Sequence, residues 1–216
     1  MLQFNNKKYL ISPSILAADF SDLENEFAKM KRAGIEYIHY DVMDNHFVPQ
    51  LTFGYKFVSD FNKKTDLLSD VHLMIENPDE CVDKYINAES DLITFHVESM
   101  KRDNALKAIE QVKNAGKDVG LSIKPKTKIS ELEPFLDLID MVLVMTVEPG
   151  FAGQQLITEC LPKISNLRET FEKKNLNIVI QADGGIKLTN IKELFQRGCT
   201  FFVMGSAFFK AVDYNV

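Results

Sequence analysis

The sequence has few cysteines, and nothing in their placement supports a disulfide-stabilised or zinc-knuckle protein. Cys81, Cys160 and Cys199 are odd in number, far apart and without a CxxC spacing. We interpret them as packing thiols in a reducing compartment, which makes the cytoplasm the expected location.

Positive charge and long apolar runs are also scarce. Lys and Arg total 25 against 31 Asp and Glu, the formal net charge is −6, and the lysines are scattered, so nucleic acid is not an expected partner. No apolar run approaches the ~20 residues that span a bilayer, and the N-terminus lacks a long apolar signal region. We expect a soluble, unprocessed protein with no membrane partner.

The chain of 216 residues is 45% hydrophobic, which is enough for one enzyme domain with a large core over residues 1–216. Strand-like and helix-like patterns alternate along it. The predicted strands are 9–16, 37–42, 67–74, 91–96, 118–123, 141–147, 178–182 and 200–204. The predicted helices are 20–34, capped by Asp19, then 53–62, 78–88 opened by Pro78, 104–115, 130–136, 157–174 and 189–197, with an eighth barely present.

Such alternation implies right-handed βαβ crossovers and a parallel sheet. Eight units in just over 200 residues favour an α/β fold of the (β/α)8 TIM-barrel type, with a shortened C-terminal helix, over an open doubly wound sheet. Active sites of these barrels lie at the C-terminal ends of the strands. Polar residues at those ends therefore become candidates for function.

Histidines and acids gather at these strand ends. His39 and Asp41 share one face of a strand, with Cα atoms roughly 6–7 Å apart, so a metal ion could lie between them. With His72 and Asp183 they would form a mixed nitrogen and oxygen site suited to one divalent ion, Zn²⁺, Fe²⁺, Mn²⁺ or Co²⁺, with positions open for a substrate. The sequence does not choose among these metals.

Other polar residues at the strand ends have simpler interpretations. Ser14, His96, Glu98 and Glu148 also reach the rim, but hydrogen bonding at the strand end explains His96 equally well, and we leave it out of the metal shell. Lys124 is interpreted as part of a solvated basic turn rather than as a Schiff-base amine. His46, in a loop, either covers the site or faces water.

Glycine-rich loops on the same rim indicate a phosphorylated substrate. The loops after the seventh and eighth strands, where such barrels bind phosphate through backbone N–H groups, contain Gly184-Gly185 and Gly205-Ser206. A third loop, Gly150-Phe151-Ala152-Gly153-Gln154, adds further amides. Three neighbouring methionines are packing residues that could also wall the site: Met43, Met74 and Met145.

Six segments make the chain resemble one family, the ribulose-phosphate 3-epimerases. They occur in the family's order over nearly the whole chain: ISPSILAADF (11–20), HYDVMDNHFVP (39–49), DVHLMIENP (70–78), VMTVEPGFAGQ (144–154), ADGGI (182–186) and VMGSAFF (203–209).

The resemblance implies a metal-dependent isomerase that interconverts D-ribulose 5-phosphate and D-xylulose 5-phosphate in the pentose phosphate pathway. It makes His39, Asp41, His72 and Asp183 the metal ligands and Asp41 and Asp183 the acid/base pair. Ser14 and His72 would contact substrate, and the methionines would line the metal site. The sugar and phosphate pocket would comprise Gly150, Phe151, Ala152, Gly153, Gly184, Gly185, Gly205 and Ser206.

This chemistry accounts for two carboxylates. Inverting C3 requires removal of a proton next to the C2 ketone and return of one to the opposite face, so an acid must stand on each side of a planar enediolate. A carboxylate with a pKa near 4 is a weak base for this purpose, and a metal would stabilise the developing charge.

The chain departs from the family pattern at two places. Asn45 stands where the family usually has glycine, and Asn tolerates positive φ, so we expect the loop to survive. The chain stops at Val216, where the family normally continues through a closing eighth helix. We expect a thin barrel wall there, with consequences for stability and for the contacts of an expected homo-oligomer.

Three alternatives remain to be weighed. An epimerase of a related ketose phosphate such as allulose 6-phosphate fits the same motifs. A non-catalytic sugar-phosphate binding barrel is disfavoured, because a binder needs no carboxylate on each face of the sugar. A decarboxylase or aldol-type synthase is set aside, since it would place an acid and a lysine at the third strand, where this chain has Asp70-Val71-His72.

Overall fold

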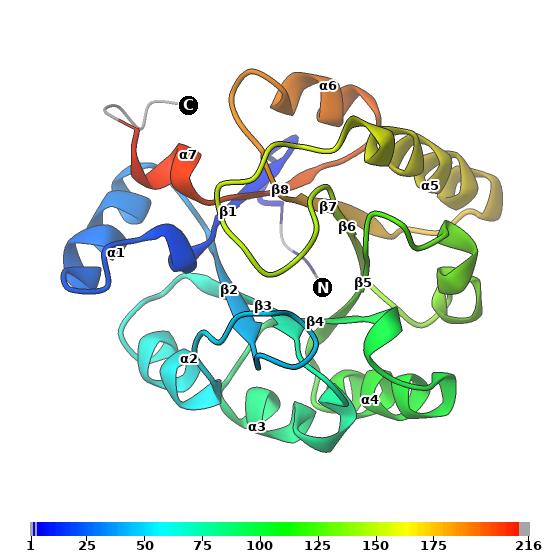
Figure 1. Ribbon diagram of the computed structural model, residues 1–216, viewed down its shortest axis with the longest axis horizontal. Coiled ribbons are helices and arrows are strands. Elements are labelled where there is room, and N and C mark those ends of the chain that lie inside the picture. Colours follow the sequence, from blue (N-terminus) through cyan, green and yellow to red (C-terminus); the bar gives the residue numbers. More distant parts are fainter. Residues whose placement is uncertain (1, 3, 212–216) are drawn as a thin grey trace.

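The structure, a computed structural model, describes residue 2 and residues 4–211, in which eight parallel strands form one curled sheet. The sheet order is β1-β8-β7-β6-β5-β4-β3-β2, and a parallel bridge from Ser14 to His39 joins its two end strands into a nearly closed barrel (Figure 1). The predicted (β/α)8 barrel is confirmed. The strands are β1 (Leu10–Pro13), β2 (Tyr37–Met43), β3 (Leu68–Met74), β4 (Leu92–His96), β5 (Asp118–Ile123), β6 (Met141–Met145), β7 (Val179–Asp183) and β8 (Phe201–Met204).

Helices surround the barrel, as Figure 1 shows in its view onto the strand ends. The α-helices are α1 (Leu23–Arg32), α2 (Tyr55–Asn62), α3 (Val82–Asn87), α4 (Arg102–Asn114), α5 (Leu161–Lys174), α6 (Ile191–Gln196) and α7 (Ser206–Phe209). The 3-10 helices are η1 (Ile15–Ala17), η2 (Pro78–Glu80), η3 (Val97–Ser99), η4 (Ile129–Phe135) and η5 (Thr158–Cys160).

Three of the predicted helix starts are wrong, and one of them is the start at residue 157, since α5 begins at Leu161 after the turn η5. The Asp19 carboxylate accepts hydrogen bonds from the Ser21 backbone N–H (2.9 Å) and hydroxyl (2.6 Å), so it closes a turn four residues before α1 begins. Pro78 opens the single turn η2, and α3 begins only at Val82. The helix predicted at 130–136 is the 3-10 helix η4, which contains Pro134 and therefore lacks one backbone donor.

The shortened eighth helix is present as the four-residue α7, which lies between α1 and α6 (Figure 1). The expectation about the chain end at Val216, and the prediction of one domain over residues 1–216, both extend to residues 212–216, which lie outside the described residues.

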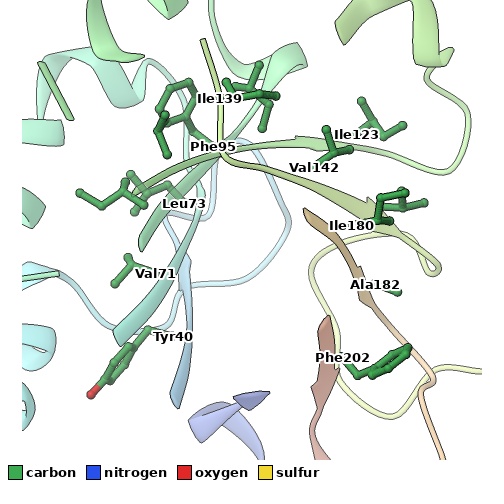
Figure 2. Packing of buried hydrophobic residues seen from close by; sticks show 14 of the residues in the cluster. Tyr40, Val71, Leu73, Phe95, Ile123, Ile139, Val142, Ile180, Ala182 and Phe202 are labelled. Atoms are coloured by element: carbon green, nitrogen blue, oxygen red, sulfur yellow. The ribbon is translucent and has the colours of Figure 1, made fainter. Parts of the chain in front are cut away.

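The two faces of the strands separate two cores. Side chains that point outward, such as Tyr40, Val71 and Ile180, pack beneath the helices (Figure 2). At the first inward positions of the strands, a second cluster plugs the base of the barrel with Leu10, Tyr37, Leu92, Met141 and Phe201 among its members. Above this plug, next to the strand ends, the inward positions hold polar side chains such as His39, Asp41 and His72 together with apolar ones such as Leu143 and Met145.

The expectations about the cysteines and about membrane spans can be compared with the described part of the chain. The three cysteines are free, as predicted, and Cys160 and Cys199 are buried. Within residues 4–211, every helix is too short or too polar to cross a membrane.

Asn45, which stands where the resembled family usually has glycine, adopts the left-handed conformation that Asn was expected to tolerate. Its φ is 60°, and its backbone N–H donates to the Gln50 carbonyl (2.8 Å) in the loop after β2.

We expect Asn45→Val to destabilise the protein by about 1–2 kcal/mol, because a β-branched residue is strained at this φ, whereas Asn45→Gly stays near wild type. Urea unfolding of the three proteins measures the difference. Equal stability of the Val and Gly variants would show that the loop does not impose this conformation.

Candidate metal centre and substrate cavity

Strand register brings the four predicted ligands together. Parallel pairing sets Asp41 of β2 beside His72 of β3, while His39, two residues before Asp41, points the same way into the barrel. Asp183, the last residue of β7, reaches the same place from the other side of the ring. One nitrogen or oxygen atom from each of these four side chains lies within 4.8 Å of the other three.

The spaces between these atoms suit a cation. His39 Nε2 lies 3.4 Å from Asp41 Oδ1, and His72 Nδ1 lies 3.6 Å from Asp41 Oδ1 and 3.9 Å from Asp183 Oδ2. Both nitrogens are buried and make no hydrogen bond within the described residues. Ligands about 2.1 Å from one ion would have separations of about 3–4 Å, so the arrangement could hold a metal ion.

In each histidine, the ring nitrogen that points away from the centre contacts a second side chain. His39 Nδ1 lies 2.7 Å from Asp70 Oδ2, which also accepts a hydrogen bond from Gln181 Nε2 (2.6 Å). His72 Nε2 lies 2.9 Å from Nε2 of His96. These outer contacts fix the directions in which His39 Nε2 and His72 Nδ1 point.

Sequence reasoning missed the contacts of Asp70 with His39 and of Gln181 with Asp70, and it left His96 outside the predicted ligand set without finding its contact with His72. A signal existed, because Asp70 and His72 share a strand face, as do His39 and Asp41. The register that sets Asp70 beside His39, and the contact of His96 with His72, are not readable from one sequence.

The two carboxylates have opposite electrostatic states. Burial raises the pKa of Asp183, and the neighbouring charge of Asp41 raises it further, to about 7. Burial also acts to raise the pKa of Asp41, but His39 and His72 outweigh it and hold this pKa well below the usual range. Without a metal, Asp41 is therefore the carboxylate that ionises first, and Asp183 is the one that keeps its proton to higher pH.

The pKa values of the two histidines are also shifted in opposite directions. Burial lowers the pKa of His39, but the carboxylates of Asp70 and Asp41 overcome this effect and hold the pKa well above its usual value. Burial dominates at His72, whose pKa is lowered. The raised pKa of His39 favours its protonated form, and a cation bound at this centre would have to displace that proton.

A cavity of about 170 Å³ opens above the centre. Asp41 and Asp183 line its floor, where the Ser14 hydroxyl donates to Asp41 Oδ2 (2.5 Å). His39 and His72 lie beneath the floor and do not line the cavity, so the predicted contact of His72 with substrate stays a prediction. The predicted residues that line the cavity are Ser14, Asp41, Met43, Met74, Met145, Gly150, Phe151, Ala152, Gly153, Asp183, Gly184, Gly185, Gly205 and Ser206.

The cavity roof comes from the loop after β6, which arches across the barrel mouth (Figure 1). This loop packs closely against the loop after β7. Gly185 has φ 67°, and a Cβ there would lie 2.4 Å from the backbone nitrogen of Leu156. Glycine is therefore required at position 185 by both conformation and space.

Four other residues of the rim loops lie away from the cavity, namely Lys124, Lys126, Lys128 and His46. Lys124 is half-buried, with its ammonium 3.7 Å from the centre of the Phe47 ring, so it is less solvated than expected; Lys126 and Lys128 beside it are exposed. His46 is exposed, and its ring Nδ1 lies 2.9 Å from the Asp44 carbonyl. It faces water rather than covering the site.

The fold and the centre define a class: a (β/α)8 barrel with a two-histidine, two-aspartate centre that could hold a metal beneath a small cavity. The family model described as Ribulose-phosphate 3 epimerase family matches residues 10–209. The chain belongs to this family.

Curated relatives agree over nearly the full length. Ribulose-phosphate 3-epimerase of Buchnera aphidicola is 40% identical over 97% of this chain and 92% of its own. The Escherichia coli protein of the same name is 39% identical over the same shares, and that of Treponema pallidum is 38% identical over 94% of this chain and 92% of its own.

Solved structures at lower identity share the fold alone. 3-Hexulose-6-phosphate synthase from Salmonella typhimurium superposes with a TM-score of 0.68 at 15% identity, covering 95% of this chain and 93% of its own. A tryptophan synthase α-subunit from Pyrococcus furiosus gives 0.68 at 14% identity, covering 94% and 89%.

Metal binding should release protons. Because the pKa of His39 is raised and that of Asp183 is about 7, we expect the metal-free protein to bind Co²⁺ more weakly at pH 6 than at pH 8 and to release between about one and two protons per ion at pH 7. Titration calorimetry in two buffers of different ionisation enthalpy measures this release. An affinity that does not change with pH would contradict the assigned protonation states.

Proposed function

We propose that this protein interconverts D-ribulose 5-phosphate and D-xylulose 5-phosphate by moving a proton at C3. Membership of the family and the names of its relatives support the substrate. The observation that carries the mechanism is the placement of Asp41 and Asp183 on strands β2 and β7, on different sides of one cavity floor, with pKa values displaced in opposite directions.

The two carboxylates perform complementary steps. The ionised one takes the C3 proton from one face of the sugar and becomes a carboxylic acid. The protonated one donates its proton to the opposite face and becomes a carboxylate. The protein ends with the same number of protons but with the roles of Asp41 and Asp183 exchanged, so the reverse reaction uses the same pair.

His39, Asp41, His72 and Asp183 would hold one divalent ion, with Zn²⁺, Fe²⁺, Mn²⁺ and Co²⁺ all suited to this mixed donor set. When bound, the ion supplies positive charge that stabilises the enediolate oxygens. Ser14 restrains Asp41 through its hydroxyl, which leaves the other carboxylate oxygen facing the histidines.

The cavity walls suit a phosphorylated sugar. Backbone groups of Gly184, Gly185, Gly205 and Ser206 are proposed to bind the phosphate, since these loops line one side of the cavity together with Lys187. The loop 150–153 would close over the sugar. Met43, Met74 and Met145 give the remaining wall an apolar surface that keeps water from the reacting carbon.

Asp183→Asn should abolish C3 inversion, because the amide cannot exchange a proton with the sugar. We expect a loss of about 10³-fold or more in turnover of ribulose 5-phosphate. Solvent deuterium at C3, measured by NMR, separates loss of inversion from loss of binding. Asp137→Asn, at an exposed position, is the matched control. A folded Asp183→Asn protein that epimerises at the wild-type rate would refute the mechanism.

Removal of metal should stop the reaction without unfolding the barrel. We expect epimerisation to fall with chelator and to return on addition of Co²⁺ or Zn²⁺, while circular dichroism stays unchanged. Parallel assays with allulose 6-phosphate test the substrate. Faster turnover of that sugar would move the assignment to the related epimerase, and no deuterium uptake from either sugar would indicate a binding protein.

A further inference from the structure

Three side chains form a line from the barrel rim to the centre. Glu98 Oε2 lies 3.1 Å from His96 Nδ1, and His96 Nε2 lies 2.9 Å from His72 Nε2. Both rings are fully buried and stack with centroids 5.0 Å apart. The remaining nitrogen of His72, Nδ1, faces Asp41 and Asp183.

Hydrogen-bond accounting sets a direction along this line. A carboxylate only accepts, so His96 Nδ1 carries the proton of the bond to Glu98. In a neutral imidazole the other nitrogen, His96 Nε2, is then an acceptor. His72 Nε2, 2.9 Å away, must donate to it. His72 Nδ1 is left with a free lone pair.

Glu98 is itself fixed in place. Its Oε1 accepts from the backbone N–H of Lys124 (2.8 Å) and from the Thr127 hydroxyl. Lys163 of α5 holds this same loop, since its ammonium donates to the carbonyls of Lys124 (3.0 Å), Pro125 (2.6 Å) and Thr127 (2.5 Å).

The line is also covered from the rim. The Phe47 ring lies against the His96 ring, with centroids 4.9 Å apart. The Lys124 ammonium lies over the Phe47 ring, 3.7 Å from its centroid. The His96 ring is therefore shut away from water that could offer alternative hydrogen bonds.

We propose that Glu98 and His96 are positioning residues that fix the Nε2–H tautomer of His72, so that its Nδ1 presents a lone pair to the metal. The inference rests on the proposed metal site and deepens it. Neither residue touches the substrate cavity, so they act only through His72.

Glu98→Gln should reverse the donor and acceptor roles of the hydrogen bonds between residue 98, His96 and His72. The Lys124 N–H requires an acceptor, which holds the amide oxygen at the Oε1 position and turns the amide NH₂ toward His96. His96 Nδ1 must then accept, its Nε2 must donate, and His72 is forced into the Nδ1–H tautomer that cannot bind a metal. Glu98→Ala removes the constraint without imposing the opposite one.

We expect Glu98→Gln to weaken Co²⁺ binding by about 10–100-fold, and by more than Glu98→Ala does. Glu76→Gln, which removes the same charge from an exposed position two residues after β3, should bind like wild type. If Glu98 merely supported the loop, the order would be opposite, because Gln keeps the Lys124 contact and Ala loses it. That opposite order would overturn the proposal.

Nitrogen NMR of the metal-free protein at pH 8 reads the tautomer directly, and the chain has only four histidines to assign. We expect His72 to be protonated at Nε2 in wild type and at Nδ1 in Glu98→Gln. A wild-type His72 protonated at Nδ1 would refute the proposal even if no variant folds. Wild-type protein that shows the expected tautomer but binds no Co²⁺ would instead refute the metal site of the proposed function.

Discussion

Three carboxylates, Asp41, Asp70 and Asp183, are drawn into the interior of one barrel, and the site depends on how their charge is compensated. An unpaired buried charge costs several kcal/mol, so each needs a partner or a proton. His39 lies between Asp41 and Asp70, and Asp183 keeps its proton up to a pKa of about 7. In the proposed mechanism, this excess of acid would both attract a cation and leave one carboxylate able to donate a proton while the other accepts one.

Much of this arrangement was predictable, because it follows from alternation along strands. The spacing of His39 and Asp41 places both on one face, and the rule that barrel strands end at the active face selected Asp183 and the glycine loops. The structure brings these residues together as predicted. Local patterns also located the strands to within a few residues, since each is a short apolar run between turn signals.

The rest depended on contacts between segments distant in the chain. The pairing of Asp70 with His39 follows from the β2–β3 register, and that of Gln181 with Asp70 joins residues 111 apart. Lys124 sits over Phe47 because the loops after β5 and β2 meet, which no pattern within either loop records. Pro78 failed as a helix signal because it is equally compatible with one turn of 3-10 helix.

The seam of the barrel lies between β1 and β2, where the sheet order ends and a single bridge joins Ser14 to His39. The residues at this seam are also those of the centre: the Ser14 hydroxyl binds Asp41 across it, and His39 is a ligand candidate. The same few side chains, Ser14, His39 and Asp41, thus take part both in closing the barrel and in the candidate centre. A substitution that disturbs the Ser14–Asp41 contact would therefore act on the closure of the barrel and on the candidate centre together.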